Sequence, residues 1–137
     1  MVIDRTHAEA MIKHARDEAP NEACGLLAGS SGQVAQLYRI KNLDESPVHY
    51  TMDPRQHIDA LQDMDSNDWD LVAAYHSHTH TRAFPSATDV RLSQGMQLLY
   101  PESLHVIVSL ADPDQPDIRA FAIQGENITE VQVTLQE

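Results

Sequence analysis

Two histidines and an aspartate are spaced so that they could bind a metal ion. His76 and His78 end an apolar run that begins at Leu71 and predicts a short buried strand. Because side chains alternate along a strand, these two imidazoles project from the same face. Asp89, eleven residues beyond His78, could supply a third, anionic ligand. Two histidines, one aspartate and an open fourth position form the ligand set of a catalytic zinc site.

The same stretch also has a purely structural interpretation. Three histidines between residues 76 and 80 are compatible with a solvated polar loop. Ser86 followed by Asp89 is the pattern of a helix N-cap with its capping-box partner, and Pro85 suits a junction between loop and helix. Both interpretations can hold together, because a helix start is a fixed place to mount a ligand. The local pattern does not choose between them.

His76-x-His78, seven residues, Ser86, two residues and Asp89 match the His-x-His-x7-Ser-x2-Asp signature of the JAMM (MPN-plus) metalloproteases, which this chain resembles. That family also has a glutamate upstream, at the end of its first helix, and Glu22 stands at the matching position. The order of the predicted elements agrees as well. The resemblance therefore extends over nearly the whole chain and rests on matches in two separate segments.

The resemblance implies a role for each of these five residues. His76, His78 and Asp89 would hold one Zn²⁺ per chain, and zinc lowers the pKa of a bound water to about 7. Glu22 would be the general base, since a carboxylate that does not bind the metal can change protonation without loosening it. Ser86 would donate its hydroxyl to the oxyanion of a tetrahedral intermediate. The implied reaction is hydrolysis of a peptide or isopeptide bond.

Three positions complicate this picture. Thr79 follows the second histidine where the family commonly has proline, so we expect a less stiff loop but unchanged chemistry. His80 offers a rival His78-x-His80 pair, although that pair would break the spacing to Ser86 and Asp89. Cys24 is a further possible ligand, but a single cysteine in an apolar strand is more often a small core residue.

Length and composition limit the class of protein. A chain of 137 residues with 42% apolar residues predicts a single domain, residues 1–137, with a sizeable core. Its only cysteine, Cys24, excludes an intrachain disulfide and favours a reducing compartment. We find no apolar run of about 18 residues that could span a membrane and no signal peptide pattern, so the expected location is the cytoplasm.

The chain is strongly acidic. It has 21 acidic residues against 9 basic ones and a net charge of -12. Such a surface repels phosphate backbones, so electrostatic binding of nucleic acid is not expected. The acidity has two interpretations: attraction of a basic partner or substrate, or adaptation to a salty cell interior where ions screen self-repulsion. The low lysine content favours the second.

The hydrophobic pattern predicts an α/β fold with a mixed, curved sheet and about three helices, as the JAMM/MPN resemblance also implies. We expect Thr6 to cap the first helix, Ile58 to point inward from the second, and Gly95 to end the third. The expected helices are 6–18, 54–64 and 86–94, and the expected strands are 24–29, 33–41, 48–52, 69–77, 104–110, 118–124 and 128–135.

The leading functional hypothesis is a zinc-dependent peptidase or isopeptidase of the short, stand-alone prokaryotic type. The resemblance implies substrates with flexible C-terminal tails, namely ubiquitin-like or sulphur-carrier proteins. Two alternatives remain: a non-catalytic scaffold on the same fold, and a general small-peptide hydrolase. Retention of all five site residues argues against the scaffold. The oligomeric state is left open.

Overall fold

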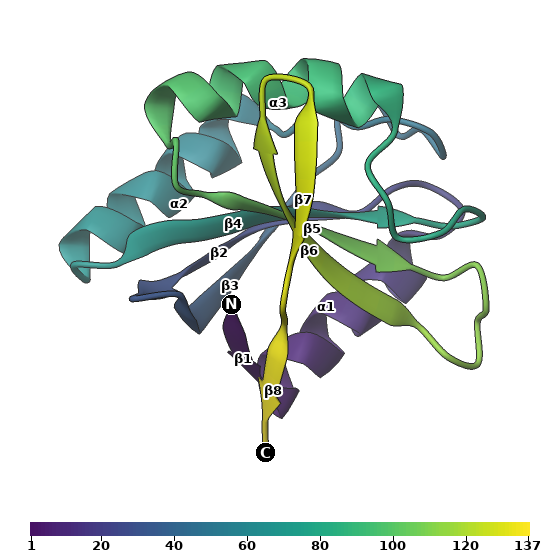
Figure 1. Ribbon diagram of the computed structural model, residues 1–137, viewed down its shortest axis with the longest axis horizontal. Coiled ribbons are helices and arrows are strands. Elements are labelled where there is room, and N and C mark those ends of the chain that lie inside the picture. The colour runs from purple at the N-terminus through teal and green to yellow at the C-terminus, as the bar shows by residue number, and fades with distance from the viewer.

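An eight-stranded mixed sheet carries three helices in the computed structural model, which describes residues 1–137 (Figure 1). The strand order is β7-β6-β5-β4-β2-β3-β1-β8. The helices are α1 (Arg5–Glu18), α2 (Pro54–Ser66) and α3 (Ala87–Leu99). The strands are β1 (Val2–Asp4), β2 (Cys24–Ser30), β3 (Gln33–Ile40), β4 (Asp70–His78), β5 (Leu104–Ser109), β6 (Asp117–Gln124), β7 (Asn127–Val131) and β8 (Thr134–Gln136).

The middle of the sheet is formed by β4, which pairs antiparallel with β2 and parallel with β5. The two ends of the chain meet at one edge, where β8 lies parallel to β1 (Figure 1). The predicted α/β class, the mixed sheet and the three helices are confirmed. None of the helices is long and apolar enough to cross a membrane.

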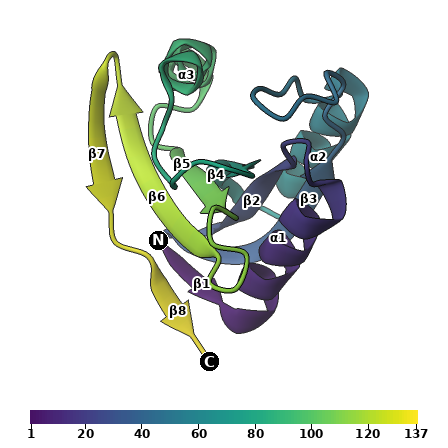
Figure 2. The same cartoon turned by 90° about the vertical axis from the view of Figure 1, so that its right-hand side faces the viewer.

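The two faces of the sheet are covered by different helices (Figure 2). On one face, α1 buries Met11 and Ala15 in a cluster with Tyr75 and Val108. On the other, Ala60 and Met64 of α2 pack with Leu26 and Ala74. Neighbouring β4 residues thus point to opposite faces: Tyr75 faces α1, whereas Ala74 faces α2. By the same alternation, His76 and His78 lie on the face that α2 and α3 cover.

Gly25 lets the aromatic ring of Tyr75 lie close against β2. A Cβ atom at this position would collide with the Tyr75 ring and with the carbonyl oxygen of Tyr38. The Tyr75 hydroxyl reaches Nδ1 of the buried His14 on α1 at 2.7 Å. This contact links α1 to the strand that ends in the two histidines.

The helices differ from prediction at two boundaries and in the orientation of one side chain. Asp4, not Thr6, caps α1, because its carboxylate accepts a hydrogen bond from the His7 amide at 2.8 Å. The third helix runs through Gly95 to Leu99; glycine costs a helix only about 1 kcal/mol, so it need not end one. Ile58 is 53% exposed rather than inward, because α2 contacts the sheet mainly through Ala60 and Met64.

The strand predictions failed where pairing depends on distant parts of the chain. Residues 48–52 form no strand; only Met52 bridges to Asn42. The expected strand 128–135 is two strands, of which β7 pairs with β6 and β8 crosses to β1. Strand β1 has only three residues and pairs with β3 and β8, so alternation within it gives no usable signal.

Candidate metal centre

The end of β4 and the start of α3 bring the three predicted ligands together. Nε2 of His76 lies 3.1 Å from Nε2 of His78. Oδ2 of Asp89 lies 3.2 Å from the first of these nitrogens and 3.1 Å from the second. All three side chains are more than nine-tenths buried. Two imidazoles and a carboxylate therefore point at one another at the end of the sheet.

This arrangement fits a zinc ion. Bonds of about 2.0–2.1 Å in a tetrahedron place neighbouring ligand atoms about 3.3 Å apart, close to the spacing of the three atoms. His78 also has the required tautomer, since its Nδ1 donates to the carbonyl oxygen of Arg82 at 2.9 Å and leaves Nε2 free to bind a metal.

Asp89 serves the helix and the ligand group at the same time. Its amide donates to Oγ of Ser86 at 3.0 Å, while the Ser86 amide donates to Oδ2 of Asp89 at 2.9 Å. This reciprocal pair confirms the predicted capping box. Burial alone would raise the pKa of Asp89, but the neighbouring imidazoles of His76 and His78 and the Ser86 amide hold that pKa well below its usual value. The carboxylate is therefore ionised and ready to bind a cation.

Glu22 lies between α1 and β2, with only 3% of its surface exposed. Its neighbour Ala23 is fixed to β4, because the Ala23 amide donates to Oγ of Ser77 at 2.8 Å and its carbonyl accepts from the Ser77 amide at 3.0 Å. Burial raises the pKa of Glu22 to about 8, and the charge of Asp89 also raises it, while His78 opposes the shift. The Oε1 atom is buried without a hydrogen-bond partner. A carboxyl group with such a pKa is suited to exchange a proton near neutral pH.

The rival ligands lie elsewhere. His80 is exposed, and the thiol of Cys24 donates to the carbonyl of Ile40 at 3.4 Å. Neither belongs to the group of converging ligand atoms. Thr79, in the place where the family commonly has proline, is buried, and its hydroxyl donates to the carbonyl of Pro20 at 3.2 Å. This bond restrains the loop that we expected to be less stiff.

Sequence reasoning missed three residues that contact the centre. The Arg82 carbonyl orients His78, but a backbone oxygen leaves no trace in the sequence. Tyr50 stacks on His76, with ring centroids 4.8 Å apart and an interplanar angle of 29°. Asn42 donates to the carbonyl of Glu22 at 3.1 Å. Residues 42–52 were predicted as a loop and a short strand, without a functional role.

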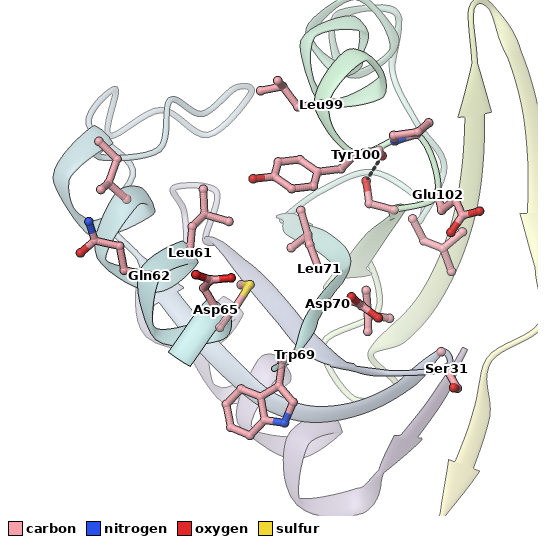
Figure 3. A pocket seen from close by; sticks show the side chains of 17 residues that line it. Ser31, Leu61, Gln62, Asp65, Trp69, Asp70, Leu71, Leu99, Tyr100 and Glu102 are labelled. Atoms are coloured by element: carbon pink, nitrogen blue, oxygen red, sulfur yellow. Dashed lines mark hydrogen bonds between the residues drawn. The ribbon is translucent and has the colours of Figure 1, made fainter. Parts of the chain in front are cut away.

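A separate pocket of about 880 Å³, lined by apolar and polar side chains, lies at the other end of β4 (Figure 3). Leu61 of α2, Leu71 of β4 and Tyr100 beyond α3 face it, together with Trp69. None of the five predicted site residues lines this pocket. The candidate metal centre is therefore distinct from it.

Comparison with known proteins identifies the class of protein. The model of the family described as prokaryotic homologs of the JAB domain matches residues 4–124. The CysO-cysteine peptidase of Mycobacterium tuberculosis is 36% identical, with 100% of this chain and 92% of the relative covered. The Desampylase of Haloferax volcanii is 36% identical over 59% of this chain and 63% of the relative. The chain belongs to the prokaryotic JAB-domain family, the short prokaryotic branch of the JAMM/MPN proteins.

A solved structure agrees with this assignment. Protein DSY2949 from Desulfitobacterium hafniense is 39% identical and superimposes with a TM-score of 0.86. The match covers 100% of this chain and 94% of that protein. The JAB1/MPN domain protein AF2198 from Archaeoglobus fulgidus, 20% identical, superimposes with a TM-score of 0.65 over 100% of both chains, so the predicted JAMM/MPN-like fold is confirmed.

Proposed function

We propose that this protein is a zinc-dependent peptidase or isopeptidase that acts on the C-terminal tail of a ubiquitin-like or sulphur-carrier protein. One observation carries the proposal. The ligand atoms of His76, His78 and Asp89 converge within 4.8 Å of one another, and the buried carboxyl group of Glu22 interacts electrostatically with the last two. Ligands and base thus come from separate segments of the chain to form one centre.

Each of the five residues has a separate role in this reaction. His76, His78 and Asp89 hold the zinc ion, which when bound supplies a Lewis acid that acidifies water and polarises the scissile carbonyl. Glu22 accepts the proton of the attacking water and passes it to the leaving nitrogen. Ser86 accepts a hydrogen bond at Oγ but its own proton has no acceptor in the protein, so it is free to donate to the developing oxyanion.

The substrate class is supported by the family and by one relative's name. The CysO-cysteine peptidase of Mycobacterium tuberculosis is named for a protein joined to a cysteine. We therefore expect this protein to remove a residue or a conjugated group from the end of a carrier protein. A flexible tail ending in Gly-Gly passes a buried metal centre more easily than a chain with bulky side chains.

The first test measures zinc and hydrolysis in matched variants. Wild-type protein should bind about one zinc per chain and His76→Ala nearly none, whereas His80→Ala, which alters an exposed histidine near the ligands, should match wild type. Glu22→Gln should keep its zinc but lose at least about 100-fold in rate on a carrier protein whose Gly-Gly tail is extended by a cysteine. Retained turnover would remove Glu22 as general base.

The same assay separates the two alternatives. A small-peptide hydrolase would cleave a short peptide with the same last residues as fast as the carrier protein. A scaffold would bind no zinc, even after zinc is added back, and would cleave neither substrate. The proposal expects faster cleavage of the carrier protein, with both activities lost in His76→Ala.

We also propose that residues 1–137 act as a single domain in the cytoplasm. One sheet takes strands from both ends of the chain, because β1 pairs with β8. The lone cysteine, Cys24, is free and buried, which suits a reducing compartment.

A further inference from the structure

Residues 42–52, which we call the clamp loop, connect β3 to α2 and lie against the candidate metal centre. The base of the loop is closed by backbone contacts. Asn42 bridges to Met52, and the Leu43 amide donates to the carbonyl of Thr51 at 2.9 Å. A loop closed in this way keeps a fixed position relative to the sheet.

The side chain of Asn42 uses its full hydrogen-bonding capacity inside this loop. Its Nδ2 donates to the carbonyl of Glu22 at 3.1 Å and to the carbonyl of His49 at 3.2 Å. Its Oδ1 accepts from the amides of Asp44 at 3.0 Å and Thr51 at 3.1 Å. An amide has two donors and two acceptor sites, and here all four are occupied. Asn42 is 8% exposed, so it joins both sides of the loop to Glu22 away from water.

The clamp loop holds Glu22 only by its backbone. The Glu22 amide donates to the carbonyl of Ser46 at 2.8 Å, and the Glu22 carbonyl accepts from Asn42. In contrast, the carboxyl group accepts no hydrogen bond, and its Oε1 is sealed from solvent. Because no hydrogen bond restrains the carboxyl group, its position depends on the backbone, which Ser77 of β4 holds at Ala23 and the clamp loop holds at Glu22.

The other side of the clamp loop lies on a candidate metal ligand. Tyr50 stacks on the His76 imidazole, which is itself 4% exposed. An aromatic ring against an imidazole limits rotation of that ring and keeps water from its face. One loop thus contacts both the candidate base and one of the three candidate ligands.

We propose that Asn42 is a positioning residue, which ties the clamp loop to Glu22 so that one loop fixes both the general base and, through Tyr50, the His76 imidazole. This inference rests on the proposed function for its kinetic consequence, but its structural part can be tested without turnover.

The structural test is amide hydrogen exchange. Asn42→Asp keeps the acceptor atoms but loses both donors, whereas the neutral Asn42→Ala loses all four bonds. Both variants should speed exchange of the Glu22 amide by at least about tenfold, while α1 amides stay unchanged. The Thr51 amide donates to Oδ1 of Asn42, so its exchange should speed up in Asn42→Ala but not in Asn42→Asp. The matched control is Asn67→Asp, whose Nδ2 donates to the carbonyl of Asp63 at 2.8 Å at the end of α2. Unchanged exchange at Glu22 in both variants would overturn the proposal.

The kinetic test asks whether Asn42 acts through Glu22. On the cysteine-extended carrier protein, Asn42→Ala should lower kcat by about 10- to 100-fold, the usual range for a group that orients a metal site. Zinc content measured with zinc in excess, and KM, should stay near wild type. In a Glu22→Gln background, the same change should lower the residual rate little further, because residues that act as a unit are not additive. If the rate losses of Asn42→Ala and Glu22→Gln multiply in the double variant, Asn42 does not act through Glu22 and its role is merely structural.

Substitutions at Tyr50 test the other contact of the clamp loop and leave Asn42 intact. Tyr50→Leu should weaken zinc binding by about tenfold in a chelator competition, and Tyr50→Phe, which keeps the stack, should restore wild-type affinity. Equal zinc affinity in all three proteins would remove Tyr50 from the proposal. Loss of turnover in wild type would instead count against the proposed function, while the exchange and zinc measurements would still decide the role of the clamp loop.

Discussion

At the scale of single residues, Asp89 is both the capping-box partner of Ser86 and a candidate metal ligand, which is why the sequence pattern supported both interpretations. One oxygen, Oδ2, accepts from the Ser86 amide and lies against both histidines. The helix cap therefore orients the carboxylate that the ligand group needs. A spacing that satisfies the capping box also places the aspartate at the end of β4, so the helix cap and the candidate metal centre use the same residue.

His14 carries a pH-dependence prediction at this scale. Burial, with the charge of Arg39, lowers its pKa from 6.5 to about 4, and its Nδ1 meets the Tyr75 hydroxyl. Between these pKa values the unfolded chain binds a proton that the folded chain does not. Stability should therefore fall as the pH drops from 6.5 towards 4, with His14 contributing about 3 kcal/mol of the loss. Urea unfolding across this range measures it.

The comparison of variants isolates His14 from other groups. His14→Gln should flatten the acid loss of stability, whereas His80→Gln, at an exposed position, should leave it unchanged. A chelator should be present throughout so that metal release contributes to neither curve. Burial also lowers the pKa of His105 to about 4, so some slope remains in every variant. Identical slopes in wild type and His14→Gln would contradict the prediction.

At the scale of elements, the fold was predictable where the pattern is local. The strand that delivers His76 and His78 and the helix that begins at Ser86 both follow from short-range spacing. Asn42 was not predictable, because its importance depends on its hydrogen bond to Glu22, which lies twenty residues away in the sequence. For the same reason β8 was misassigned: its partner, β1, lies at the far end of the sequence.

The third helix is the least buried of the three. Only Ser93 is buried within it, while Leu98 and Leu99 are 86% and 75% exposed. It is attached at its start through Asp89 and later through Gln94 and Gln97, whose side chains bond the backbone of Gly125. An element with so few buried contacts should open locally at low free energy.

Removing the metal should therefore loosen α3 more than any other helix. With zinc at about 100 times its dissociation constant, binding adds about 2.7 kcal/mol, so a chelator should speed exchange of the first α3 amides by up to about 100-fold. Amides of α1 beside Met11 should change far less. The control is Asp89→Asn, in which the chelator should have little effect. Equal acceleration in α1 and α3 would show that the metal stabilises the molecule uniformly.

At the scale of the whole molecule, the acidic residues carry far more charge than the basic residues can neutralise. The ion pairs that lysine and arginine make are exposed contacts such as Arg5–Glu137 and Lys13–Asp17, and a net charge of -12 remains. Exposed pairs contribute little to stability, whereas like charges over a small surface repel one another. The folded protein should therefore be more stable when salt screens this repulsion.

The salt response decides between the two interpretations of the acidity. Raising the salt concentration from about 0.05 M to about 1 M shortens the screening length to about 3 Å, so Tm should rise by several degrees. Asp59→Asn with Asp65→Asn, both on the exposed side of α2, should reduce this rise. If acidity is adaptation to a salty interior, kcat/KM for the carrier protein should hold at high salt. If it steers a basic substrate, kcat/KM should fall as salt increases even while Tm rises, because steering depends on unscreened charge.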